Sequence, residues 1–194
     1  MIEEAALSAA VGRATLALSE RTPTVTTLAA AWREARAADP DFARVRWNRR
    51  IEVDTTTLDR LIERFGIPDF VKIDVEGGEP AVFAGLSRPV RILSFEYLPR
   101  ALDDVEACIM HLNALGTYRF NWSAGESYRL ASSRWLNDQE LLADLREPSG
   151  QRRPGDVYAQ LVDRLRRDGA EPARPNSRTV RVPALRINDE EADS

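Results

Sequence analysis

Acidic residues and a lysine alternate in the short stretch DFVKIDVEGGEP, residues 69 to 80. Lys72, Asp74 and Glu76 occupy every second position there, and a third acid, Glu96, lies near the end of the apolar run VRILSFEY. Alternate residues of an extended strand point to the same face, so the spacing predicts that the first three side chains lie together. Carboxylates and an ammonium in an apolar layer must pair, bind a ligand or line a cleft. The pattern is consistent with a structural ion pair and with a site for proton transfer.

Lysine is otherwise missing from this chain. Of the 27 basic residues only Lys72 is a lysine, which leaves 27 − 1 = 26 arginines. Arginine presents a planar, permanently charged fork, whereas lysine presents a compact ammonium whose pKa shifts readily. A chain that uses arginine almost everywhere therefore favours a functional role for its one lysine. We predict catalytic roles for Lys72, Asp74, Glu76 and Glu96.

The turn EGGEP after this strand raises a second hypothesis, a nucleotide site. A strand, a glycine turn, a helix and a later acid imitate the order of such sites. The turn lacks the G-x-G-x-x-G spacing, and Glu76 and Glu79 would repel a phosphate. We therefore predict no phosphate cradle. A divalent metal shared by Asp74, Glu76 and Glu96 is chemically possible, because carboxylates suit hard cations, but three acids at strand ends do not by themselves define a metal site.

The elements that must position these residues alternate between strand and helix. A Thr-capped helix is predicted at 24–40, a helix at 55–68 from its apolar spacing, and further helices at 79–86, 101–116, 137–147 and 156–165. Strands are predicted at 5–20 (two, around Gly12), 43–54, 69–75, 90–97, 118–122 and 127–132. This order argues for an α/β layered sheet with its ligand site at the carboxyl ends of the strands.

Composition limits the class of protein. At 194 residues, a net charge of −4 and a pI near 5.2, nothing indicates nucleic acid or an anionic membrane as a partner. No apolar run approaches the ~20 residues of a membrane span, and the N-terminus lacks a basic leader, so we expect a cytoplasmic protein. One cysteine and one histidine exclude an internal disulfide and a soft-ligand zinc site. We predict one domain over residues 1–165 and a flexible tail over 166–194.

Four other polar residues are weaker candidates. Cys108 and His111 lie three apart in a predicted helix, and without a third orienting group they are expected to flank the core. Tyr97 and Asn121 follow or end strands and are candidates to touch an acceptor molecule.

The segment TTTLDRLIERFGIPDFVKIDVEGGEPAVFAGL, followed by ILSFEYLP, closely resembles the FkbM-type methyltransferase family. The likeness extends backward to AAVGRATLALS and forward to PGDVYA, over roughly residues 5 to 160. It implies a class I, Rossmann-like methyltransferase sheet that uses S-adenosylmethionine, with a C-terminal antiparallel hairpin and closing helices. It also implies methyl transfer to a hydroxyl of a small metabolite or sugar, with Lys72, Asp74, Glu76 and Glu96 near the transferred methyl and Gly77 in the cofactor-binding turn.

The chain departs from the family pattern in its N-terminal part. The glycine-rich turn after a first strand, and the acid that would hold the ribose, have no counterpart here. The resemblance therefore predicts a partial sheet that lacks its first strands and an incomplete S-adenosylmethionine pocket. A partner chain that supplies the missing half would complete it, and a sheet without its outer strands would expose an apolar edge that favours self-association.

Two functions remain open from the sequence. One is an enzyme, the catalytic and acceptor-side part of an S-adenosylmethionine-dependent methyltransferase with a small-molecule acceptor. The alternative is a non-enzymatic remnant or binding module of the same fold that has lost cofactor binding. In the enzyme, Asp74 or Glu76 is the candidate base, and Lys72 holds the acceptor or lowers the pKa of a neighbouring carboxylate.

Overall fold

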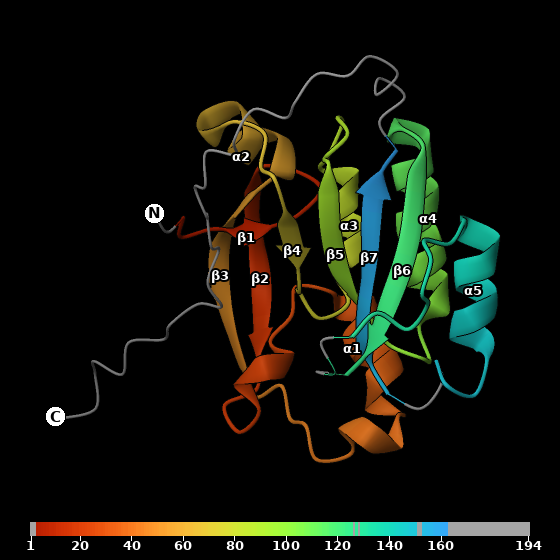
Figure 1. Cartoon of the computed structure of the whole chain (residues 1–194). Helices are drawn as coiled ribbons and strands as arrows, with labels where there is room; N and C mark the ends of the chain where they lie inside the picture. The colour runs from red at the N-terminus through yellow and green to blue at the C-terminus, as the bar shows by residue number, and fades with distance from the viewer. Residues whose placement is uncertain (1–2, 126, 128, 151–152, 163–194) are drawn as a thin grey trace, which may run out of the picture.

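The computed structural model describes residues 3–125, 127, 129–150 and 153–162 (Figure 1). The strands are β1 (Ala6–Leu7), β2 (Gly12–Leu18), β3 (Arg49–Thr56), β4 (Val71–Ile73), β5 (Ile92–Tyr97), β6 (Tyr118–Ala124) and β7 (Gly155–Leu161). The helices are α1 (Ala30–Ala37), α2 (Leu58–Phe65), α3 (Glu79–Ala84), α4 (Leu102–Leu115) and α5 (Asp138–Arg146). Short 3₁₀ turns lie at Pro23–Val25 and Pro40–Phe42. The predicted α/β class is confirmed.

The strands form two mixed sheets. The smaller has the order β1-β3-β2, in which β3 pairs parallel with β1 and antiparallel with β2. The larger has the order β4-β5-β7-β6. In it β4 and β5 are parallel, and β7 lies antiparallel to both of its neighbours. The carboxyl ends of β4 and β5 therefore meet at one edge of the larger sheet (Figure 1).

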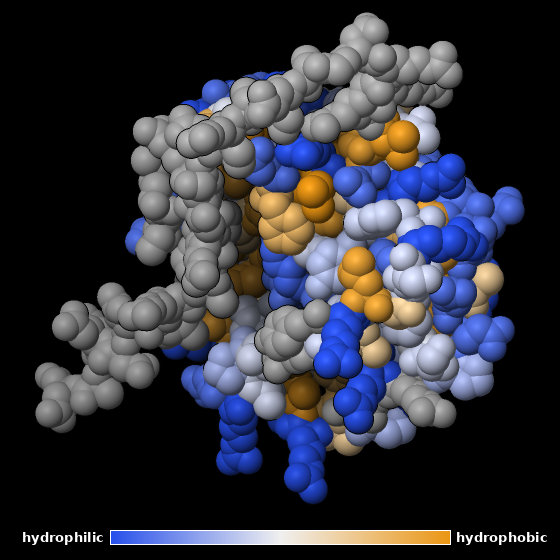
Figure 2. Space-filling view, viewed as in Figure 1, coloured by the Kyte–Doolittle hydropathy of each residue, from blue (hydrophilic) through white to orange (hydrophobic). Residues whose placement is uncertain are grey.

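The larger sheet has one apolar face and one polar face. Helices α3 and α4 lie behind it in Figure 1 and bury its apolar side chains, with Phe83 edge-on to Phe95 at a ring distance of 5.3 Å. The opposite side, here called the polar face, carries the alternate residues of the same strands. Its members are Lys72, Ile92, Ser94, Glu96, Arg119, Asn121, Ser123, Asp156, Tyr158 and Gln160, all polar except Ile92. Figure 2 shows this side of the molecule, where hydrophilic residues predominate over β6 and α5.

The predicted helices of the middle of the chain are confirmed, and their ends have local causes. Thr57 caps α2 by accepting a hydrogen bond from the Arg60 amide, and Gly66 ends it at a φ of 88° that suits glycine. Asn137 begins α5 with a capping box, in which Asn137 and Glu140 accept each other's backbone amides. At α1 the expected threonine cap is wrong, because Ala29 occupies the cap position without a side-chain bond.

Two predictions near the C-terminal end of the sheet are wrong. A helix is expected over residues 156–165, but Gly155–Leu161 is strand β7, which fills the slot between β5 and β6. The strand expected at 127–132 does not form among its described residues, although the Ala131 amide donates one hydrogen bond to the Trp122 carbonyl of β6. Leu136 instead makes an isolated antiparallel bridge with Phe120.

Strand β4 is also shorter than the strand predicted over residues 69–75. It covers Val71–Ile73 and pairs only with β5 among the described residues, so it is an edge strand of the larger sheet. Phe70, just before it, is half exposed. The expected tail over 166–194 lies outside the described residues. Within the part that is described, no helix combines the length and apolar content needed to cross a bilayer.

The capping box of α5 gives a test of the fold. We expect Asn137→Ala to lower the free energy of unfolding by about 1 kcal/mol, because the Glu140 amide loses its acceptor. Urea unfolding measures the loss. The matched control is Gln139→Ala, which changes an exposed residue of the same helix that takes no part in the capping box. Equal midpoints for both variants would contradict the assigned role of the cap.

Candidate active site

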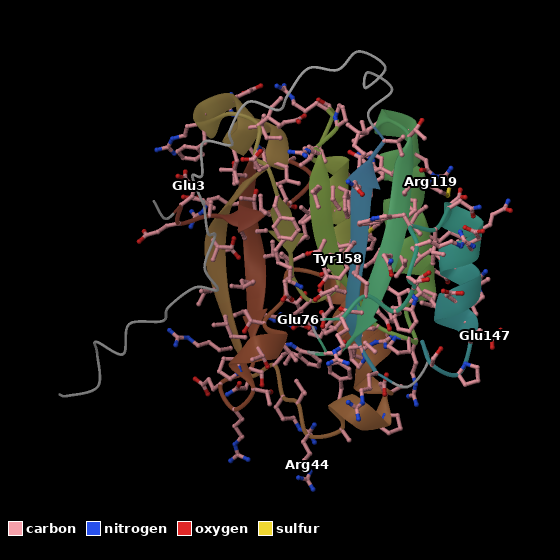
Figure 3. The ribbon with its side chains drawn as sticks, in the orientation of Figure 1. Glu3, Arg44, Glu76, Arg119, Glu147 and Tyr158 are labelled. Carbon is pink, nitrogen blue, oxygen red and sulfur yellow. The ribbon has the colours of Figure 1, made fainter. Side chains whose placement is uncertain are left out.

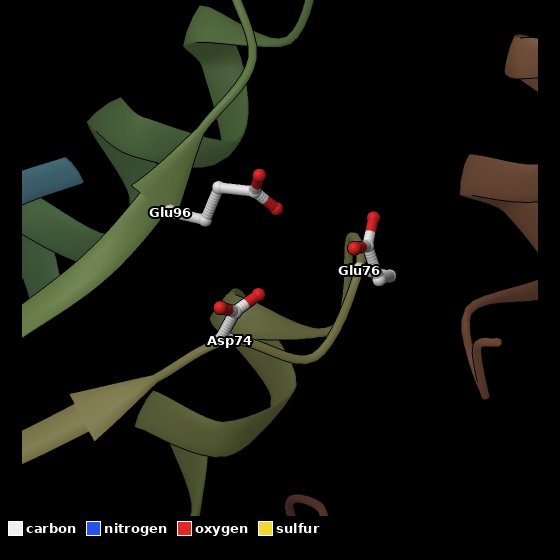
Figure 4. Close-up of side chains that lie close together, drawn as sticks. All are labelled: Asp74, Glu76 and Glu96. Carbon is white, nitrogen blue, oxygen red and sulfur yellow. The ribbon is translucent and has the colours of Figure 1, made fainter. Parts of the chain in front are cut away.

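Three carboxylates converge at the carboxyl ends of β4 and β5. Glu96 comes from β5, and Asp74 and Glu76 come from the loop that follows β4 (Figure 4). One carboxylate oxygen of each lies within 4.8 Å of the others. Figure 3 places Glu76 at the lower ends of these strands, beside the smaller sheet. The structure therefore brings together the three acids that the sequence singled out.

The geometry differs from the predicted strand alternation. The strand ends at Ile73, so Asp74 and Glu76 lie in the loop, where Glu76 has a φ of 54°. A left-handed backbone is uncommon for a residue with a side chain, and it requires support from the surroundings. Thr27 gives that support, since its hydroxyl donates to the Glu76 carbonyl at 2.7 Å and accepts from the Ala29 amide. The N-terminal part of the chain thus holds the acidic loop in place.

Burial and mutual repulsion raise the pKa of two of these acids. Burial is the larger cause for Glu76, followed by the charges of Asp74 and Glu79, and its pKa rises to about 7. For Glu96, burial and then the charges of Glu76 and Asp74 raise the pKa to about 8. The Lys72 charge opposes both shifts. Carboxyl groups in this range can exchange protons near neutral pH.

A fourth acid, Glu79, shapes the loop from inside. It is 5% exposed, and its carboxylate accepts the Val75 amide at 3.1 Å. Burial raises its pKa, while backbone amides of the turn, including that of Gly77, act in the opposite direction. Glu79 therefore serves as an internal cap of the 75–79 turn, whereas the sequence pattern indicates only its repulsion of a phosphate.

Gly77, the predicted cofactor-binding glycine, packs against an aromatic ring. Its φ is 84°, and a Cβ placed on it would lie 2.1 Å from the Trp32 indole. The absence of a side chain at Gly77 thus lets Trp32 of α1 pack directly against the backbone of the turn. A contact between Gly77 and a cofactor stays a prediction.

Lys72 lies on the polar face beside two carboxylates. Its ammonium forms an ion pair with Asp156 of β7 and lies 3.5 Å from Asp74. Burial disfavours the charged ammonium, but Asp156, then Asp74 and Glu96, outweigh it and raise the pKa of Lys72. Asp156 is not identifiable as a site residue from the sequence, because its segment also fits a helix. The alternation of Val157 and Ala159 after it was the available signal for a strand.

A small pocket adjoins the acidic cluster. It is lined by Trp32 and Gly77 on one side, by Glu79, and by Glu96 and Tyr97 of β5. Its cavity volume is about 10 Å³, room for about one water molecule.

The weaker candidates have structural partners. Cys108 is buried and burial raises the pKa of its thiol, and the His111 ring bonds the Leu86 carbonyl at 2.8 Å. Cys108 is therefore part of the core itself, whereas the partly buried His111 flanks it, as expected. The Asn121 amide donates to the Ser132 and Arg134 carbonyls, so it fastens the loop after β6. Tyr97 is buried, with its hydroxyl 3.4 Å from the Gly150 carbonyl, and burial raises its pKa to about 12.

The contact between Gly77 and Trp32 predicts the effect of a single methyl group. We expect Gly77→Ala to destabilise the protein by more than about 2 kcal/mol, because the new Cβ collides with the indole and the positive φ is strained. Gly66→Ala is the matched control, since Gly66 has a similar φ of 88° but a Cβ added there would meet nothing within 4 Å. Urea unfolding and near-ultraviolet circular dichroism compare them. Equal losses would mean that backbone strain alone matters and that Trp32 yields.

The raised carboxyl pKa values predict a pH-dependent stability. Glu76 and Glu96 hold protons in the folded state at pH values where the unfolded chain, with an ordinary pKa of 4.5, has lost them. Their contribution is therefore complete below about pH 4.5 and is lost as the pH rises through about 7 to 8. We expect the urea midpoint to fall over this range, and to fall less in Glu96→Gln than in the exposed control Glu34→Gln. A wild-type midpoint that rises across the range would contradict the assigned shifts.

Comparison with known proteins agrees with the resemblance seen in the sequence. The family model described as the methyltransferase FkbM domain matches residues 2–134, more than half of the chain and the whole of the acidic loop. Neither the search of curated proteins nor the search of solved structures gave a match. The mixed α/β architecture is consistent with a methyltransferase-like fold. The chain therefore belongs to the FkbM methyltransferase family.

Proposed function

We propose that this protein is an S-adenosylmethionine-dependent methyltransferase that acts on a hydroxyl of a small metabolite or sugar. The observation that carries the proposal is the convergence of Asp74, Glu76 and Glu96 at the carboxyl ends of two parallel strands. Ligands of open α/β sheets bind at such ends. Family membership supports methyl transfer as the reaction.

The acids of the site have a defined task in this reaction. A hydroxyl oxygen becomes a better methyl acceptor when a base removes its proton as the bond to carbon forms. Glu76 and Glu96, with pKa values of about 7 and 8, are stronger bases than ordinary carboxylates and are still partly ionised near neutral pH. The hydroxyl proton would pass to a carboxylate oxygen of one of them.

The charge of the site fits one end of S-adenosylmethionine, because three carboxylates attract a sulfonium cation. When bound, this cofactor supplies the methyl group. The described pocket next to Glu96 and Gly77 is too small for the adenosyl part, since its cavity measures about 10 Å³ while small-molecule sites span ~300–1,000 Å³. We therefore propose an incomplete class I sheet, whose cofactor site draws on residues outside the described ones or on another polypeptide.

Two measurements test the proposal. Calorimetry with S-adenosylmethionine should give weak binding, with a dissociation constant above about 100 µM, because the contacts to the adenosyl group are few. At millimolar labelled cofactor and a panel of sugars and small alcohols, the loss of the proton acceptor, by Glu96→Gln or by Glu76→Gln, should lower the transfer rate ~100-fold. The exposed control Glu34→Gln should leave the rate unchanged.

The outcomes separate the two functions that the sequence left open. Transfer that depends on Glu96 or Glu76 supports the enzyme. Tight binding at low micromolar concentration would contradict the incomplete pocket. No transfer to any acceptor at saturating cofactor, in folded protein, would favour a binding module that has lost catalysis.

A further inference from the structure

The polar face carries an acid outside the predicted catalytic set. Asp156 of β7 lies directly opposite Glu96 of β5, and its carboxylate contacts the Lys72 ammonium of β4. Strands β4 and β7 flank β5 on opposite sides. The ion pair therefore crosses over the strand that carries Glu96.

A small residue makes this crossing feasible. Lys72 pairs with Ser94 on β5, and Ser94 pairs with Tyr158 on β7. Neighbouring strands lie about 4.8 Å apart, so the Lys72 stem has to pass over one strand to meet Asp156. Ser94 is 1% exposed and has a short side chain, which leaves the space above it to the lysine.

The charges of the site fall into two groups, those paired with Lys72 and those without an ion pair. Lys72 faces Asp74 of the loop, Glu96 of β5 and Asp156 of β7, and it forms ion pairs with Asp74 and Asp156. Among the described residues, no ion pair joins Glu76 or Glu96 to a cation. The one ammonium at the site is thus drawn toward β7 and away from the two acids that remain unpaired.

We propose that Asp156 is a positioning residue, whose carboxylate holds Lys72 above β5 as a permanent cation. Lys72 then supplies a fixed positive charge, and Glu76 and Glu96 are left to accept the proton. The base assignment within this statement rests on the proposed methyl transfer. In that reaction the hydroxyl O–H bond breaks, its proton joins a Glu76 or Glu96 oxygen, and the methyl group bonds to the hydroxyl oxygen as its bond to the sulfonium sulfur breaks. The state of Lys72 does not depend on any activity.

The single lysine gives a direct test in the whole protein. An amine-acylating reagent can modify only Lys72 and the N-terminus, and mass spectrometry of the Lys72 peptide measures its rate alone. The side chain is 40% exposed and so can be reached. Because only the neutral amine reacts, we expect Asp156→Asn to speed acylation about two- to fivefold below pH 10, the range of partly exposed ion pairs. The pH profile of the rate should move to lower pH.

Controls separate this role from a general change in the fold. Asp69→Asn removes an exposed acid three residues from Lys72 and should leave the rate unchanged. Asp156→Glu keeps the charge and should restore a rate near that of the wild type. Should Asp156→Asn unfold, high salt on the wild-type protein must speed acylation by itself.

Two results would overturn the proposal. One is an unchanged pH profile in folded Asp156→Asn. The other is a wild-type Lys72 that acylates as fast as a free lysine, which would leave it available as a base. Both are independent of whether methyl transfer is found, so failure of the inference and failure of the proposed function can be distinguished.

Discussion

The backbone ladder of β7 is the constraint on which the functional half of the molecule depends. This strand pairs antiparallel with β5 over Ile92–Tyr97 and with β6 over Tyr118–Ala124. Without it, β6 would have no partner in the larger sheet and the β5 edge would be unpaired. Its alternation buries Val157 and Ala159 against the helices and turns Asp156 toward the polar face. One strand thus supplies both sheet continuity and the partner of the site lysine.

The distribution of charges explains why two of the three clustered acids keep their protons to higher pH. Asp74, Glu76 and Glu96 lie within 4.8 Å of each other, yet the one lysine is held by Asp156. Partial burial makes the remaining negative charges costly, so two of the acids hold their protons to higher pH. Groups whose pKa values are shifted by burial and by like charges are typical of functional sites. Thr27 and Glu79 hold in place the loop that carries Asp74 and Glu76, by hydrogen bonds to the Glu76 carbonyl and the Val75 amide.

Local signals are sufficient for the middle of the chain but not for its end. The helix α2 has an apolar stripe, a threonine cap and a terminal glycine, all within one segment. The residues of β7 are ambiguous in isolation, because Val157, Gln160 and Leu161 also fit a helical spacing, and only the slot between β5 and β6 decides. The three acids at the strand ends could be predicted because local signals identify the strands that precede or carry them. Asp156 could not, because its own segment also fits a helix. Trp32 and Gly77 are in contact but lie far apart in the sequence, and the local pattern around neither residue indicates this contact.

The proximity of Glu76 and Glu96 means that they titrate as a pair. The charge of Glu76 raises the pKa of Glu96, and the charges of Asp74 and Glu79 raise the pKa values of both. Between about pH 7 and pH 8 the pair therefore holds about one proton and retains about one negative charge. A site in this state can accept a proton from a hydroxyl and still attract a cation. A fixed Lys72 preserves that state, because an ammonium that moved onto Glu96 would lower the carboxyl pKa and weaken the base.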